Sequence, residues 1–385
     1  MSNVTEQSKP STDKSQWAIL AGLRFALAMV VVLAHLRWVV PSTGAHSWLG
    51  AAGPTAAVYG FLLISGYSIA SSLSSQPSGY LRRRVIRIAP VYYACCALAW
   101  LPWLLCGPIV TMQNGLTLQQ PTLFVTAANL AMLQSFVSDT QNSLAPAWTL
   151  SIECFFYLIA PWLMKQKTAP LVIACALSAT GSYFWFKAPH MRLDYLWLAW
   201  AWIGGFIIYR HRERPIAWVV AGIAGIIMTS GTIADYNPGV FARYTIGLTV
   251  LLMWVAPRLN VSERLGKWLD LAGDISYPLY LAHFPVLITL YALLRGTAWN
   301  APSLYIAAAI GVSVAIYYGF DLPMRKRLSG KRIAAKNALV TAEDKPSAPR
   351  RPKQNIFVLG RKHVRCGTVD GVASSPSDSA SASIG

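Results

Sequence analysis

The sequence has little charge. Only 12% of its 385 residues are Asp, Glu, Lys or Arg, whereas 55% are hydrophobic. Soluble globular domains carry about twice that share of charge. Between Ile88 and Met164 no Lys or Arg occurs at all. This composition excludes an ordinary soluble enzyme and predicts an all-α, polytopic membrane helix bundle.

Closely spaced cysteines are also lacking. None of the six cysteines forms a CxxC or CxxxC pair, so neither a metal cluster nor a disulfide framework is predicted. No A-x-A cleavage site follows the first apolar run, at 17–40. That run is therefore interpreted as a retained helix rather than a signal peptide.

The net charge of +18 comes from short basic clusters between apolar runs. No aromatic-interleaved basic surface accompanies them, so nucleic acid is not a predicted partner. Such clusters are typical of the cytoplasmic loops of membrane proteins. The predicted partner that explains the charge is the lipid bilayer.

The apolar runs predict about ten transmembrane helices, at 17–40, 51–73, 91–105, 148–164, 170–186, 194–209, 216–234, 244–255, 275–294 and 304–320. With the N-terminus inside, every large basic cluster becomes cytoplasmic, and the opposite loops hold only Lys187, Arg192, Arg243 and Arg295. Both termini are therefore predicted to be cytoplasmic.

The segment 122–136 is too short to span and is interpreted as a re-entrant or interfacial helix, since an eleventh span would invert all later loops. Three regions are expected: a polar cytoplasmic segment at 1–16, the membrane domain at 17–328, and a tail at 329–385. The tail is basic and then rich in Ser and Ala, and is expected to be disordered.

The first apolar run carries Arg24 and His35 inside it. Eleven residues of α-helix bring them within about 20° of one face and roughly 16 Å apart along the axis. The run thus presents a cation for an anionic ligand and a group that can exchange protons near neutral pH. Alternatively, Arg24 snorkels to the headgroups and His35 is a packing residue.

An arginine cluster at 82–87 follows the second run. If it is helical, Arg84 and Arg87 share a face and can bind phosphate oxygens in pairs. The alternative is a topology signal, which is favoured for Arg82 and Arg83.

An acidic residue, Glu153, lies one to two turns into the fourth span. A carboxylate there is costly unless it is paired. It could orient a histidine or accept from a substrate hydroxyl, or it could pair with an arginine and hold helices in register.

In the ninth span His283 lies near mid-membrane, with Tyr277 and Tyr280 a few residues before it, and all three are candidate substrate-binding residues. His283 could instead be a packing residue of the core, which is the favoured interpretation for this histidine. In the second span, Ser65-Gly66-Tyr67 marks a point where helices or a ligand can approach closely.

Taken in order, six blocks resemble the acyltransferase 3 family: LAGLR continuing to His35, FLLISGY, RRVIRIAPVYY, WTLSIECFFYL, SYPLYLAHFPV and Asp321-Leu322-Pro323. Members are integral membrane O-acyltransferases that modify sugars and surface polysaccharides, and ten helices are expected. The resemblance runs from about 17 to 327. It departs from the family pattern at Ala57, Thr149 and Asp321, where Gly, Ser and Glu are usual.

By this resemblance, Arg24 and His35 match the family's R-x10-H pair, Arg84 and Arg87 its R-x-x-R motif, and Glu153 the acid of its W-S-L-x-x-E block. The extracellular hydrolase-like domain of some members is not expected in this chain. Acyl transfer would then be completed by this chain or passed to a separate partner, such as polysaccharide-assembly proteins.

The predicted mechanism uses acyl-CoA, expected to be acetyl-CoA, as a co-substrate with no bound cofactor. Arg84, Arg87 and Arg24 would hold its phosphates. His35 would act as general base or carry the acyl group, with Glu153 orienting its imidazole. The expected acceptor is an external or lipid-linked glycan, such as lipopolysaccharide O-antigen or exopolysaccharide, at the bacterial inner membrane.

The competing prediction is a proton-coupled transporter or flippase, since buried Arg, His and Glu also suit a carrier. Against it, the two halves show no internal repeat, and an Arg-x-x-Arg motif suits a phosphate-bearing donor better than a permeant. A purely structural role would leave the intramembrane charges without a function.

Overall fold

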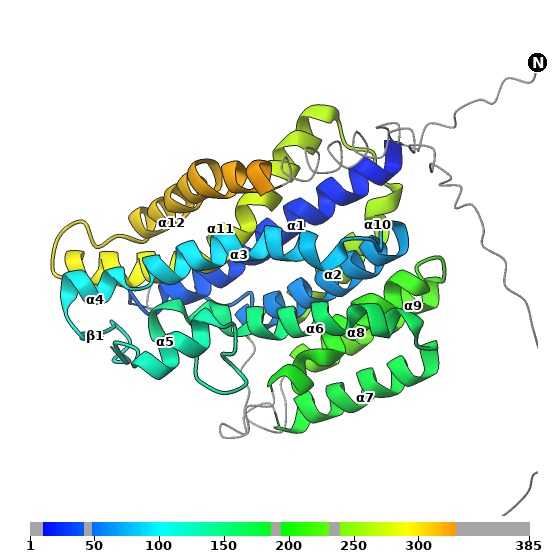
Figure 1. Cartoon of the computed structure of the whole chain (residues 1–385), viewed down its shortest axis with the longest axis horizontal. Helices are drawn as coiled ribbons and strands as arrows, with labels where there is room; N and C mark the ends of the chain where they lie inside the picture. The colour runs from blue at the N-terminus through cyan, green and yellow to red at the C-terminus, as the bar shows by residue number, and fades with distance from the viewer. Residues whose placement is uncertain (1–10, 42–47, 186–193, 231–238, 329–385) are drawn as a thin grey trace, which may run out of the picture. The chain divides into compact units, whose positions relative to one another are not determined.

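The computed structural model of the chain describes residues 11–41, 48–185, 194–230 and 239–328 (Figure 1). The long helices are α1 (Ser11–Leu36), α2 (Pro54–Ser75), α3 (Tyr80–Leu98), α6 (Trp148–Lys165), α7 (Thr168–Trp185), α8 (Asp194–Arg210), α9 (Pro215–Thr229), α10 (Ala242–Val255), α11 (Glu263–Leu294) and α12 (Pro302–Ile316). Two shorter helices are α4 (Leu101–Cys106) and α5 (Leu123–Leu130).

The remaining regular elements are small. Strands β1 (Ile109–Thr111) and β2 (Thr117–Gln119) form an antiparallel hairpin with Val110 opposite Leu118. Short turns of other helix types cover Asn142–Ala147, Ala256–Arg258 and Tyr317–Asp321. The chain is thus mostly helical, as predicted.

Six helical segments are long and apolar enough to cross a membrane: Lys14–Leu36, Pro54–Ser75, Tyr80–Cys106, Asn142–Lys165, Glu263–Leu294 and Pro302–Leu328. Shorter apolar helices occupy Thr168–Phe184 and Pro215–Thr229. At 1.5 Å per residue, a helix of about 15 residues falls short of the roughly 30 Å hydrocarbon core. A membrane protein is therefore supported, while the count of ten spans and the cytoplasmic termini stay predictions.

Helix α3 begins earlier than the predicted span at 91–105 and ends sooner. It starts at Tyr80, directly after Gly79, whose φ of 67° makes the left-handed bend. The arginine cluster is therefore helical, because arginine is a good helix former even where hydropathy is low. The apolar run then breaks after Leu98, and its end forms the separate helix α4.

Two other span boundaries also differ from the prediction. Helix α11 begins at Glu263, well before 275, because Ser262 caps it by accepting from the Leu265 backbone N–H at 3.3 Å. Helix α1 begins within the polar segment 1–16 and ends at Leu36, so 37–40 is not helical and His35 lies in the last turn. In the 122–136 segment only α5 is helical.

Some predictions fall outside the described residues. These are the tail at 329–385, residues 1–10, the end of the predicted span at 216–234, and the outer-loop residues Lys187 and Arg192.

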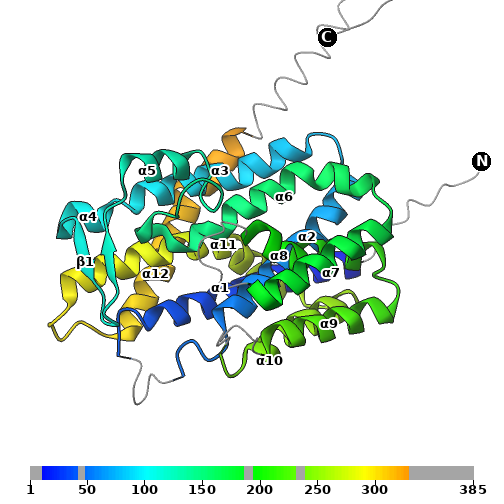
Figure 2. The ribbon, with the colours of Figure 1, turned by 90° about the horizontal axis from the view of Figure 1, so that it is seen from below.

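The bundle is built on two helix pairs (Figures 1 and 2). Helix α1 packs along α11, and α2 packs along α8. Helix α12 then lies against α11, α7 against α8, and α10 against both α2 and α9. Helices α1 and α2 also contact each other, and polar side chains of α1, α2 and α11 line one cavity.

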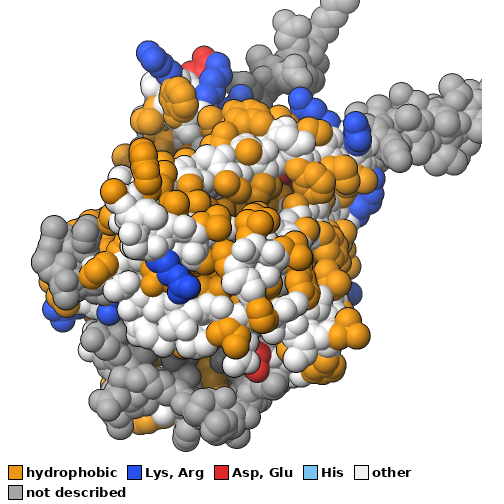
Figure 3. All heavy atoms as spheres, turned by 90° about the vertical axis from the view of Figure 1, so that its left-hand side faces the viewer, with side chains coloured by type: hydrophobic (Ala, Val, Ile, Leu, Met, Phe, Trp, Pro, Cys, Tyr) orange, Lys and Arg blue, Asp and Glu red, His pale blue; other side chains and the backbone are white. Residues whose placement is uncertain are grey.

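Large hydrophobic side chains remain exposed on the outer helices. Leu123, Leu158 and Leu177 are each more than 60% exposed. Figure 3 shows one face of the molecule, where hydrophobic side chains are widespread and charged ones are few. Exposed apolar side chains along the sides of the outer helices, such as Leu158 of α6 and Leu177 of α7, are expected where helices face lipid.

The second span's small-residue site, Ser65-Gly66-Tyr67, is a helix contact. A Cβ on Gly66 would lie 1.9 Å from the Trp202 carbonyl oxygen, and one on Gly205 would lie 2.0 Å from the Leu63 carbonyl oxygen. Two backbones can approach this closely only where side chains are missing. The glycines of α2 and α8 therefore fix the distance between these helices.

Replacing Gly66 with alanine should destabilise the protein. The new Cβ would meet backbone, which cannot rotate away, so α2 and α8 must separate and repack. The free energy of unfolding should therefore fall by at least about 3 kcal/mol, the upper end of the usual cost of overpacking. The matched control is Gly311→Ala on α12, where no atom lies within 4 Å of a new Cβ. Thermal unfolding in nanodiscs should show a lower midpoint for Gly66→Ala alone; equal midpoints would contradict this role.

An ion-pair cluster joins α11 to the segment after α12. Asp321 is fully buried and accepts hydrogen bonds from Arg325 at both carboxylate oxygens, Nε lying 2.8 Å from Oδ1. Arg325 Nη1 also donates to Asp274 of α11 at 3.2 Å. Asp321 of the Asp-Leu-Pro block thus holds Arg325, and Arg325 makes the bond to α11, so the role of Asp321 here is structural.

Candidate active site

A cavity of about 530 Å³ lies among α1, α2, α3, α6 and α11. This is large enough for a substrate of moderate size. Its charged lining residues are Arg24 of α1, Arg84 and Arg87 of α3, and Glu153 of α6. Of the five residues predicted to bind the donor or act in catalysis, these four line one cavity, and they come from three helices. The fifth, His35, does not line it.

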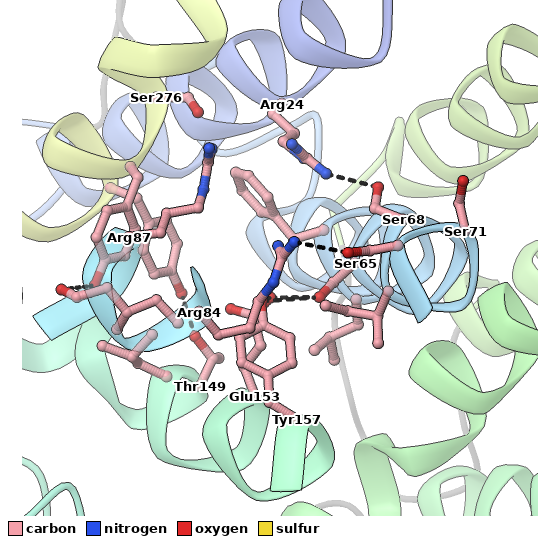
Figure 4. Close-up of a pocket in the computed structure, with 18 of the residues that line it drawn as sticks. Arg24, Ser65, Ser68, Ser71, Arg84, Arg87, Thr149, Glu153, Tyr157 and Ser276 are labelled. Carbon is pink, nitrogen blue, oxygen red and sulfur yellow. Dashed lines mark hydrogen bonds between the residues drawn. The ribbon is translucent and has the colours of Figure 1, made fainter. Parts of the chain in front are cut away.

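The three arginines reach into the cavity from two sides (Figure 4). Arg24 Nη2 donates to Ser68 Oγ at 2.8 Å, and Arg84 Nη2 donates to Ser72 Oγ at 3.2 Å. The Nε–H of Arg84 is buried and has no hydrogen-bond partner within the described residues. Arg84 and Arg87 share the cavity-facing side of α3, as their i, i+3 spacing predicts. Donors are therefore available to a ligand.

Glu153 is bonded to hydroxyl groups. Ser65 Oγ and the Tyr157 hydroxyl each donate to its Oε1 at 2.5 Å. Within the described ranges no ion pair joins Glu153 to an arginine, so the predicted alternative of a Glu–Arg pair is not seen. Three guanidinium groups against one carboxylate leave the cavity positive, which suits a ligand with several negative charges.

A stripe of serines on α2 faces the arginines, and sequence reasoning missed it. The lining hydroxyls are those of Ser65, Ser68, Ser71, Ser72 and Ser75. Their spacing of three, four and seven residues places most of them on one side of a helix. That spacing was the available signal, since a polar stripe on an apolar helix has to face polar surroundings.

Two histidines, His35 of α1 and His283 of α11, form a pair beyond the cavity. His35 Nδ1 lies 3.0 Å from His283 Nε2. His283 is fully buried, and its Nδ1 lies 2.9 Å from the Leu279 carbonyl oxygen. The rings of Trp38 and Phe284 pack against His35, with centroids 5.5 Å and 4.9 Å away.

This pairing corrects the predicted contact between Glu153 and His35. The structure gives His35 a histidine partner and gives Glu153 two hydroxyl partners. The reason is depth in the bundle: Glu153 is level with Ser65 and Arg24 in the cavity, whereas His35 lies eleven residues farther along α1.

Tyr280 lies between the cavity and the histidine pair. Its ring lines the cavity, and its centroid is 6.5 Å from that of His283 and 5.3 Å from that of Phe61. Neither histidine lines the cavity. The Arg24–His35 stripe of α1 therefore leads from the arginine cavity to the histidine pair past Tyr280 and Phe61.

The two predicted substrate-binding tyrosines line the cavity but have partners in the protein. The Tyr277 hydroxyl donates to the Ile88 carbonyl oxygen at 3.1 Å, and the Tyr280 hydroxyl lies 2.8 Å from Thr149 Oγ1. Their rings shape the wall between α3, α6 and α11.

Arg82 and Arg83 do not line the cavity. Arg82 donates to the Leu328 carbonyl oxygen, and Arg83 donates to backbone carbonyls of Gln76 and Ser78. Within the cluster, only Arg84 and Arg87 are directed at the candidate site.

Comparisons with known proteins agree with the geometry. Residues 17–320 match the acyltransferase domain of the acyltransferase 3 family. The chain is 26% identical to Nodulation protein 10 of Rhizobium leguminosarum bv. viciae over 276 residues, which is 60% of this chain and 72% of that protein. No solved structure matches. Because the domain match covers most of the chain and nearly all of the helical bundle, the protein belongs to the acyltransferase 3 family and is a membrane acyltransferase.

Proposed function

We propose that the protein transfers an acyl group, acetyl in the first instance, from acyl-CoA to a hydroxyl of a cell-surface or lipid-linked glycan at the bacterial inner membrane. The observation that carries this proposal is the positive cavity of Arg24, Arg84 and Arg87 beside a helix that leads to His35. Coenzyme A is a polyanion attached to a long flexible arm, and it has the charge and the reach that such an arrangement would select.

The arginines would bind the phosphates of the donor. Guanidinium groups form paired, charge-assisted hydrogen bonds with phosphate oxygens, and the serine stripe offers further hydroxyl donors. The pantetheine arm would then extend along α1 past Phe61 and Tyr280, whose rings must move aside to admit it. In that position the thioester would lie at the histidine pair and the phosphates would stay in the cavity.

His35 would act as the general base. Its free ring nitrogen takes the proton of the glycan hydroxyl while the oxygen attacks the thioester carbonyl carbon. The carbon–sulfur bond then breaks, and the leaving thiolate receives the proton from His35. The net result is an ester on the glycan and free CoA.

The experiment uses the purified full-length protein in nanodiscs with radiolabelled acetyl-CoA, with and without bulk surface glycan from the source cells. Glycan-dependent release of CoA with label in the glycan would support the proposal. Movement of glycan across the bilayer without any turnover of acetyl-CoA would instead favour the transporter. The same measurement with longer acyl-CoA donors tests the preference for acetyl.

A further inference from the structure

The histidine pair carries information about proton positions. His283 Nδ1 lies 2.9 Å from the backbone oxygen of Leu279, and a carbonyl oxygen can only accept a hydrogen bond. His283 Nδ1 must therefore carry the proton. In a neutral imidazole the other nitrogen, Nε2, is then a bare acceptor.

That acceptor faces His35. His35 Nδ1 lies 3.0 Å from His283 Nε2, so His35 must be the donor in this bond. The proton of neutral His35 is thereby held on Nδ1, and the lone pair is left on Nε2. The Leu279 carbonyl oxygen therefore sets the donor and the acceptor in both hydrogen bonds, that of His283 to Leu279 and that of His35 to His283.

Each histidine ring also has a further backbone carbonyl within hydrogen-bond reach, that of Val31 for His35 and that of Tyr280 for His283. His283 is fully buried, and the rings of Trp38 and Phe284 pack against His35. Buried polar groups are expected to be hydrogen-bonded, and a lost partner in an apolar setting costs more than one in water. The pair is therefore held in one tautomeric arrangement.

We propose that His283 is a positioning residue, which holds His35 in the tautomer whose Nε2 is free to take a proton. The aspartate of a Ser-His-Asp triad has the same task, to fix the tautomer and the ring orientation of the base. Here a neutral imidazole anchored to a backbone carbonyl does so. The inference rests on the proposed role of His35 as base, and it replaces the prediction that His283 binds substrate.

Two substitutions separate positioning from packing. His283→Gln can keep an oxygen near the position of Nε2 that accepts from His35, whereas His283→Leu removes the acceptor. The control is His211→Leu, because His211 is bonded to Thr168 and does not line the cavity. All variants are compared by thermal unfolding in nanodiscs.

The first measurement is the ¹⁵N NMR spectrum of histidine-labelled protein at a pH where His35 is neutral, with His35 identified by the signal lost in His35→Asn. The proton of His35 is expected on Nδ1 in the wild type and in His283→Gln, and distributed over both nitrogens in His283→Leu. A proton on Nε2 in the wild type would overturn the proposal. Because no turnover is needed, this result stands apart from the success or failure of the proposed function.

The second measurement is transfer kinetics. In His283→Leu, kcat should fall at least about 10-fold, since a base in the wrong tautomer is largely inactive, with little change in the KM for acetyl-CoA. His283→Gln should recover most of that loss. Equal losses of kcat in two well-folded variants would show that His283 acts through packing and would reject the proposal.

Discussion

Replacing His35 with alanine is expected to lower kcat for acyl transfer by about 10²- to 10⁴-fold, the usual contribution of a general base. The structure adds a second expectation. Because His35 does not line the arginine cavity, binding of the CoA moiety should be unchanged. The loss should therefore appear in kcat, with the dissociation constant of CoA close to the wild-type value.

The measurement is single-turnover transfer from labelled acetyl-CoA, together with equilibrium binding of CoA to the same nanodisc preparation. His211→Ala is the matched control, as another histidine bonded to a threonine away from the cavity. Full transfer by correctly inserted His35→Ala would remove His35 from the mechanism. Loss of CoA binding would instead show that the histidine pair and the cavity form one site.

The sequence predicts the cavity's charges well because charge in an apolar helix is costly. Arg24 and Glu153 had to be buried with partners, and the i, i+3 spacing of Arg84 and Arg87 had to put them on one side of a helix. These four residues do line one cavity. Local spacing and burial cost were sufficient here, because each argument concerns one helix at a time.

Contacts between helices were less predictable. His35 and His283 are 248 residues apart, and nothing in either helix shows how deeply it sits against the other. The predicted pairing of Glu153 with His35 was wrong for this reason: sequence shows that both face inward, but not that they lie at different levels. The start of α11 at Glu263 was missed because its first turns are polar, so hydropathy gave no sign of a helix.

Removing Arg84 or Arg87 is the second large effect we expect. A charge-assisted hydrogen bond contributes about 1.5–3 kcal/mol, so Arg84→Gln and Arg87→Gln should each raise the dissociation constant of acetyl-CoA by about 10- to 150-fold. The control is Arg82→Gln. It removes the same charge from the same helix, but Arg82 is exposed and donates to the Leu328 backbone instead of lining the cavity.

Donor analogues can show that the lost contacts are contacts to phosphate. Acetyl-pantetheine carries the thioester arm without the nucleotide phosphates, and acetyl-dephospho-CoA lacks only the 3′-phosphate. In a double-mutant cycle between residue and ligand, the penalty of each arginine substitution should vanish when its phosphate is missing. An undiminished penalty with acetyl-pantetheine would mean that Arg84 and Arg87 act through the shape of the cavity, since a residue cannot lose a contact to a group that the ligand lacks.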